Sequence, residues 1–137
     1  MLDRRTFILS AAAAGFAPVA VRAAEGLAYT PGMVDGLLAE GRTVFVDFYT
    51  NWCSTCAAQS RVITELRKQN RAYDNALTFV NVDWDQYSRD DLSIRLNIPR
   101  RSTLVALHGD QELGRIVAGT SKSDIKALMD RALMAAA

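Results

Sequence analysis

The fold of this chain is decided by residues 43–56, which read TVFVDFYTNWCSTC. The first seven of these residues are β-branched or aromatic at nearly every position, a pattern typical of a strand that is covered on both faces. Thr50 and Asn51 interrupt the pattern. From Cys53 to about Arg71, apolar residues recur every four positions, which predicts a helix with one buried stripe. The stretch therefore predicts a buried strand that leads directly into an amphipathic helix.

Outward from this unit, helix and strand patterns alternate along the chain. Strand–helix–strand connections run parallel, whereas the turn at Gly109-Asp110 is short enough to force two strands antiparallel. We therefore expect an α/β fold with a mixed central sheet and helices on both faces. The expected helices are 31–40, about 89–96 and one that begins near Ser121, and the further strands are 77–82, 103–107 and 113–117, with a short leading strand near 27–29.

The beginning of the chain has the pattern of an export signal. Arg4 and Arg5 precede an apolar stretch over residues 7–20, and the small-residue rule places a cut after Ala23. The paired arginines followed by Phe7 resemble the twin-arginine export motif. We expect residues 1–23 to be a signal peptide and residues 24–137 to form the domain of a periplasmic bacterial protein; an ordinary secretory signal or an uncleaved amphipathic anchor are the alternatives.

Composition indicates one globular domain. The chain has 137 residues, of which 50% are hydrophobic and 23% are charged, and it contains three prolines. These values are typical of a packed single domain and exclude a collagen-like or disordered chain. The formal net charge of +1 gives no electrostatic reason to expect a nucleic-acid partner.

The chain contains two cysteines, Cys53 and Cys56, at the predicted start of a helix. A closed zinc site needs four ligands, and His108 adds at most one more. A disulfide between residues three apart closes a very small loop and so stabilises a fold little. A redox role explains the spacing better: a helix N-terminus favours the thiolate of Cys53 as nucleophile, and Cys56 can then resolve a mixed disulfide.

The cysteine motif and three further segments of the chain together resemble one known protein family. The run 46–56, the strand 80–83, the strand 103–107 and the closing segment 119–133 resemble the thioredoxin family. The resemblance implies a thioredoxin fold and thiol-disulfide oxidoreductase activity, with the redox-active disulfide of Cys53 and Cys56 in place of a bound cofactor. Tyr49, with the tryptophan and cysteines after it, is similar to periplasmic domains such as the C-terminal domain of DsbD.

The resemblance also implies roles for residues around the cysteines. Asp47 matches the family's buried acid, which takes the proton of Cys56; a hydrogen-bonded or edge-exposed aspartate is the alternative. Trp52 is expected to be exposed, to shield the cysteines and to meet substrate. Phe79 and Val80 stand where the family often has a lysine, so the usual partner of the acid is missing.

The main departure from the family lies at Ser102, which stands where the resemblance demands a cis-proline that faces the cysteines. A cis bond before serine costs about 2.5–4 kcal/mol, so we expect this bond either to relax to trans or to be held under strain. Ser102 and Thr103 are the expected substrate-binding residues of this loop. Loss of the proline also leaves room for a metal or cluster that bridges two monomers.

We therefore expect a monomeric oxidoreductase that reduces or exchanges disulfides in exported proteins. Reduction is favoured over oxidation, because Ser54 and Thr55 include no histidine between the cysteines. A reductase outside the cytoplasm needs electrons, which implies a membrane donor of the DsbD type as partner. The alternatives are a non-catalytic binding or chaperone module and a dimer-bridged metal or iron-sulfur site.

Overall fold

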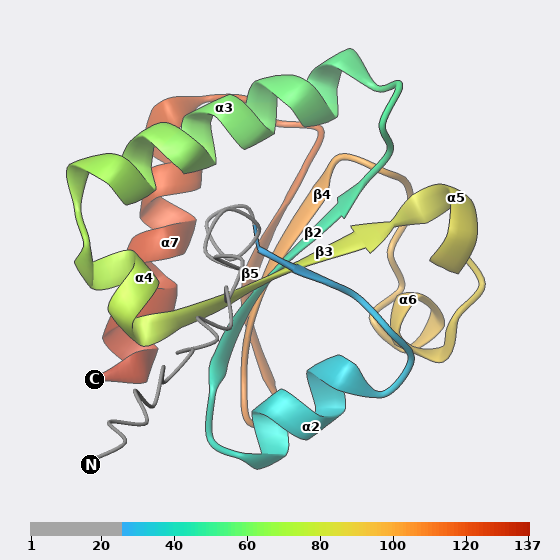
Figure 1. Ribbon diagram of the computed structural model, residues 1–137, viewed down its shortest axis with the longest axis horizontal. Coiled ribbons are helices and arrows are strands. Elements are labelled where there is room, and N and C mark those ends of the chain that lie inside the picture. Colours follow the sequence, from blue (N-terminus) through green and yellow to red (C-terminus); the bar gives the residue numbers. More distant parts are fainter. Residues whose placement is uncertain (1–25) are drawn as a thin grey trace, which may run out of the picture.

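The computed structural model describes residues 26–137, which form a five-stranded mixed sheet with helices on both sides (Figure 1). The strand order is β1-β3-β2-β4-β5; β1, β3 and β2 run parallel, and β4 is antiparallel to both β2 and β5. The elements are β1 (Leu27–Ala28), α2 (Met33–Ala39), β2 (Thr43–Tyr49), α3 (Ser54–Gln69), α4 (Ala72–Ala76), β3 (Leu77–Asp83), α5 (Trp84–Tyr87), α6 (Asp91–Arg95), β4 (Thr103–His108), β5 (Gln111–Val117) and α7 (Lys122–Ala136). The mixed sheet confirms the predicted α/β architecture.

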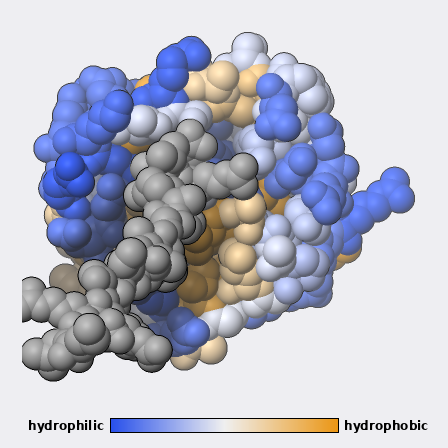
Figure 2. Space-filling view, in the orientation of Figure 1, coloured by the Kyte–Doolittle hydropathy of each residue, from blue (hydrophilic) through white to orange (hydrophobic). Residues whose placement is uncertain are grey.

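The sheet divides the core into two clusters. Figure 1 shows α3, α4 and α7 on one side of the sheet and α2, α5 and α6 on the other. Successive residues of β2 point to opposite faces, so Phe45 packs with Ile63 and Met129 on the first side, while Val44 and Phe48 pack on the second. Most residues of β2 are buried, as predicted for a strand that is covered on both faces. Figure 2 shows hydrophilic surface over α4 and the adjoining end of α3.

The structure corrects the prediction between the second and third strands. The helix that begins at the cysteines ends at Gln69 and not at Arg71, because Asn70 is extended with φ −140°. The Asn70 side chain then accepts a hydrogen bond from the Ala72 N–H and starts α4, which the sequence did not predict. The short helix α5 was also missed; it is capped by Asp83, which accepts from the Asp85 N–H.

The predicted signal peptide, residues 1–23, lies outside the described residues and stays a prediction. Within residues 26–137, none of the helices is long and apolar enough to cross a bilayer. The described residues form a single fold built around β2, and the carboxyl end of β2 delivers the chain directly to the cysteines.

Candidate active site

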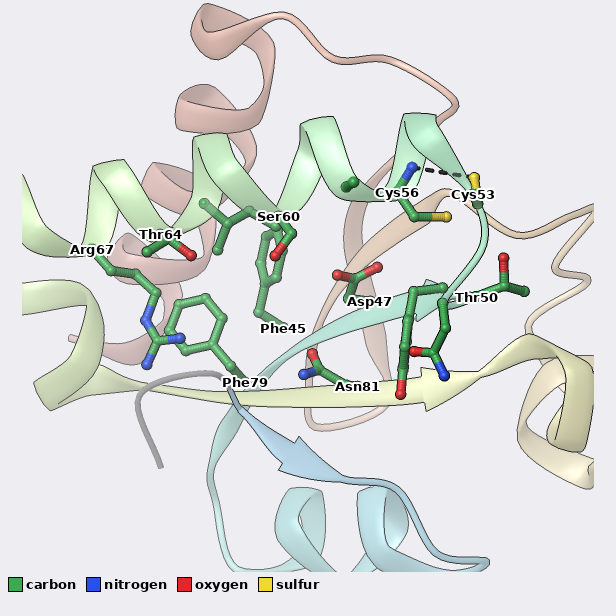
Figure 3. A pocket seen from close by; sticks show the side chains of 14 residues that line it. Phe45, Asp47, Thr50, Cys53, Cys56, Ser60, Thr64, Arg67, Phe79 and Asn81 are labelled. Carbon is green, nitrogen blue, oxygen red and sulfur yellow. Dashed lines mark hydrogen bonds between the residues drawn. The ribbon is translucent and has the colours of Figure 1, made fainter. Parts of the chain in front are cut away.

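Cys53 caps the helix that contains Cys56. It is the N-cap residue of α3, and its Sγ accepts a hydrogen bond of 3.2 Å from the Cys56 N–H (Figure 3). Both thiols are free, and the residues are only 7% and 4% exposed. A helix N-terminus carries unsatisfied N–H groups and partial positive charge, so a thiolate at this position is stabilised by the helix itself.

Ser102 lies against both sulfurs. Its Oγ is 3.2 Å from Cys53 Sγ and 3.0 Å from Cys56 Sγ, and the residue is fully buried. The described residues contain no cis peptide bond, so the bond before Ser102 is trans. The strain falls instead on the residue itself, whose φ of 63° lies in the left-handed region.

The backbone of Ser102 is held inside the protein. Its N–H donates to the Phe48 carbonyl at 2.7 Å, and its own carbonyl accepts from the Ala118 N–H at 2.8 Å and from Gln59 Nε2 at 2.9 Å. Thr103 is equally buried, and its hydroxyl donates to the Arg100 carbonyl. These groups are therefore occupied within the fold, and substrate binding by Ser102 and Thr103 stays a prediction.

The two thiols have different acidities because their surroundings differ. Burial alone raises the pKa of Cys53, but hydrogen bonds from Cys56, Ser102 and Arg101 outweigh burial and lower the pKa to about 6. Burial raises the pKa of Cys56, and its interaction with Cys53 raises it further. The arrangement thus holds Cys53 as the thiolate and Cys56 as the thiol near neutral pH.

Asp47 is the acid beneath the cysteines. It comes from β2, and Figure 3 shows its carboxylate between the sheet and Cys56. Its Oδ1 is buried and has no hydrogen-bond partner among the described residues. Burial raises the pKa of Asp47 to about 7, and the negative charge of Cys53 adds to the effect. Asp47 pairs with Asn81 of β3, and β3 contains no lysine.

A cleft of about 690 Å³ connects this acid with the surface. Cys56, Ser60 and Thr64 line one wall at successive turns of α3, so this side of the helix is polar (Figure 3). At the far end, the Arg67 guanidinium lies 4.1 Å from the centre of the Phe79 ring and binds Asp74. The cleft therefore reaches both Asp47 and Cys56, and Ser102 is not among the residues that line it.

Trp52 lies outside the cysteines and is 63% exposed. Its indole N–H donates to Asp85 Oδ2 at 2.8 Å, and the Arg101 guanidinium lies 4.3 Å from the ring centre. These two contacts fix the orientation of a large exposed aromatic next to the reactive sulfur. Its contact with substrate stays a prediction.

Sequence reasoning missed three residues that support the site. Gln59 donates to the carbonyls of Ser102 and Gly119, both at 2.9 Å, and ties the loop before β4 to α3. Arg101 and Asp85 hold Trp52 from two other segments. These contacts join residues that are distant in sequence, so no local pattern signals them.

Metal ligands are not gathered around the cysteines in the described residues. Within residues 26–137 there is no group of three or more His, Cys, Asp or Glu side chains that could hold a metal ion. His108 binds the Thr43 hydroxyl at 2.7 Å, at the end of β4 away from the cysteines. A metal or cluster site at the cysteines would therefore need ligands from outside these residues.

Two thiols at a helix N-terminus, one acidic and one not, with a carboxyl group behind them, define a dithiol oxidoreductase of α/β fold. The chain belongs to the thioredoxin family, whose family model, described as Thioredoxin, matches residues 33–131. The family and the fold make the protein a thiol-disulfide oxidoreductase.

Individual relatives agree with this assignment. The thioredoxin of Mycoplasmoides gallisepticum is 27% identical over 96 residues, which cover 70% of this chain and 90% of that protein. The structure of Trxlp from Edwardsiella tarda is similar with a TM-score of 0.64 and 27% identity, covering 75% of this chain and 98% of the other. Schistosoma mansoni thioredoxin, 23% identical over 78% of this chain and 94% of its own, shares the fold with a TM-score of 0.61.

The acidity of Cys53 can be measured directly. Thiolates absorb at 240 nm, so the reduced protein is expected to gain absorbance as pH rises, with a midpoint near the pKa of about 6. Cys53→Ser is expected to lose this step, while Cys56→Ser retains a step at low pH. A wild-type midpoint at the ordinary thiol value of about 8.5 would contradict the assignment.

Asp47→Asn is expected to stabilise the reduced protein, and more at high pH. The raised pKa of Asp47 means that the folded state resists ionisation, so its stability falls as pH rises from about 4 to about 7. The gain from the substitution should therefore be about 2 to 3 kcal/mol larger at pH 8 than at pH 5. Urea unfolding under reducing conditions measures it. An equal gain at both pH values would show that Asp47 is not the titrating group.

Proposed function

We propose that this protein reduces or exchanges disulfides in exported proteins, with Cys53 as nucleophile, Cys56 as resolving thiol and Asp47 as proton acceptor. The observation that carries the proposal is the contrast between the two thiols: the pKa of Cys53 is lowered to about 6, while that of Cys56 is raised. A thiolate beside a protonated partner is ready to attack a disulfide and still has a second thiol to release the product.

The reaction has two exchange steps. The Cys53 thiolate attacks one sulfur of a substrate disulfide, forms a mixed disulfide and expels the other sulfur as a thiolate. Cys56 then loses its proton and attacks Cys53 Sγ, which forms the Cys53–Cys56 disulfide and releases the second substrate thiolate. Two electrons pass from the protein to the substrate, and the two released thiolates take up protons.

Asp47 is suited to take the proton of Cys56. Its raised pKa of about 7 allows the carboxyl group to exchange a proton near neutral pH. The cleft that Asp47 shares with Cys56 also includes the exposed Ser60 and Thr64, so it offers a route by which the proton can leave to solvent.

The direction and the location of the reaction are parts of the same proposal. The N-terminal pattern with Arg4 and Arg5 supports export to the periplasm, and the absence of histidine between the cysteines supports reduction. A periplasmic reductase must itself be reduced, so a membrane electron donor of the DsbD type is the proposed partner. The protein is proposed to act as a monomer on disulfide-containing exported proteins, with no bound cofactor.

Insulin reduction separates this function from the two alternatives. With dithiothreitol as electron source, the wild type is expected to speed insulin precipitation, and Cys53→Ser is expected to fall to the rate without protein, because the attacking sulfur is gone. Cys56→Ser should trap a mixed disulfide through Cys53, visible as a mass increase that a reductant reverses.

Equal activity of wild type and Cys53→Ser would instead favour the binding or chaperone module. Metal or inorganic sulfide that copurifies with a dimer, found by elemental analysis and an absorption spectrum, would favour the bridged site.

Export has its own test. Expressed from its first residue in a bacterium with a twin-arginine system, the protein is expected in the periplasm, with its N-terminus near residue 24. Replacing Arg4 and Arg5 together by lysine should leave it in the cytoplasm at full length, because lysine keeps the charge but not the arginine pair. Efficient export of the lysine variant would point to an ordinary secretory signal, and cytoplasmic wild type would contradict export.

A further inference from the structure

The Ser102 hydroxyl is hydrogen bonded to both sulfurs of the dithiol site at once. The distances are 3.2 Å to Cys53 Sγ and 3.0 Å to Cys56 Sγ. A hydroxyl has one proton to donate and two lone pairs that accept. It can therefore donate to only one sulfur at a time while accepting from the other.

Charge decides which sulfur receives the proton. Hydrogen bonds to an ionised acceptor are about twice as strong as neutral ones, so the hydroxyl donates to whichever sulfur is negative. In the reduced protein that sulfur is Cys53, and the Cys56 thiol can donate in turn to Ser102 Oγ. During the second exchange step Cys53 is uncharged in a mixed disulfide, and the negative charge develops on Cys56.

We propose that Ser102 is a catalytic residue whose hydroxyl donates first to the Cys53 thiolate and then, by rotating about its C–O bond, to the Cys56 thiolate as Cys56 attacks the mixed disulfide. The proposal rests on the proposed order of attack by Cys53 and resolution by Cys56. Ser102 forms no covalent bond and keeps its proton; the proton of Cys56 still passes to Asp47.

The loop is built to hold the oxygen atom still while its proton turns. Three hydrogen bonds fix the Ser102 backbone, from its own N–H to Phe48 and to its carbonyl from Ala118 and Gln59. They also hold the residue at φ 63°, which an L-residue adopts at some cost in energy. Because Ser102 is fully buried, solvent does not compete for its hydroxyl.

Other groups contribute to the charge on the two sulfurs but do not duplicate this role. The Cys56 N–H donates to Cys53 Sγ, and Arg101 adds a hydrogen bond to the same sulfur. Asp47 faces the pair from β2 and is a proton acceptor, not a donor, when ionised. Among the described residues, Ser102 supplies the side-chain hydroxyl that is bonded to both sulfurs.

Two substitutions in the full chain test whether the Ser102 hydroxyl donates to the Cys53 thiolate. Ser102→Ala and Ser102→Gly both remove the hydroxyl, and glycine also accepts φ 63° without strain, so this variant is expected to fold. Each should raise the midpoint of the 240 nm titration by about one pH unit, the size expected from losing a hydrogen bond to a charge. Ser123→Ala, which removes an exposed hydroxyl from α7 away from the cysteines, should leave the midpoint unchanged.

Donation by Ser102 to Cys56 during resolution is tested with the reaction of the reduced protein with 5,5′-dithiobis(2-nitrobenzoate), a small aromatic disulfide. Attack by Cys53 releases a first coloured thiolate, and resolution by Cys56 releases a second, so stopped-flow absorbance at 412 nm resolves both steps. At pH 8, where Cys53 is ionised in the variants as well, both substitutions are expected to slow the second release about tenfold and to change the first by less than threefold.

A midpoint that stays at the wild-type value, or a second release within twofold of wild type, would overturn the proposal. So would an effect of alanine that glycine does not share, because that effect would come from backbone strain. Insulin reduction by the wild type distinguishes failure of the proposed role of Ser102 from failure of the proposed function. A wild type inactive on insulin but sensitive to both substitutions contradicts the substrate class alone, whereas an active wild type with insensitive variants contradicts the role of Ser102 alone.

Discussion

The hydrogen bond from the Cys56 N–H to Cys53 Sγ is the interaction on which the site depends. The first turn of α3 needs an acceptor for its free N–H groups, and a buried thiolate needs donors; a sulfur at the N-cap meets both needs with the same contact. The contact forms because β2 ends at Tyr49 and the chain turns into α3 within a few residues. The central strand thereby places Cys53 at the helix N-terminus, where the hydrogen bond lowers the pKa of its thiol.

Charge on Cys53 also governs Asp47. Its Oδ1 is buried and has no hydrogen-bond partner among residues 26–137; burial raises the pKa of Asp47, and the Cys53 thiolate raises it further. Two negative charges so close in a buried site disfavour each other. In the proposed reaction, Cys53 loses its charge when it enters a mixed disulfide, so the pKa of Asp47 should fall and its carboxylate should become available at the step in which Cys56 loses its proton. The order of the two steps is thus favoured by electrostatics.

The sequence predicts the parts of this molecule whose signals are local. Residues 43–56 contain the central strand, the helix start and four residues of the site, and the structure places β2 over the predicted range. The helices α4 and α5 were missed because each is only a turn or so long and lacks apolar periodicity. Each follows a short-range side-chain hydrogen bond, from the Ala72 N–H to Asn70 or from the Asp85 N–H to Asp83. Gln59 and Arg101 were missed because their contacts depend on how distant segments pack.

The loop at Ser102 shows how hydrogen bonds can hold a residue at an unfavourable backbone angle. Ser102 is held at φ 63° by partners on β2, on α3 and just after β5. Ala118, the partner after β5, also has a positive φ, and Gln59 binds the next residue, Gly119, with the same amide. The position of the hydroxyl between the sulfurs therefore depends on how the β5–α7 junction packs against α3. Substitutions in that junction should therefore shift the Ser102 hydroxyl relative to the two sulfurs, although the junction itself does not contact the cysteines.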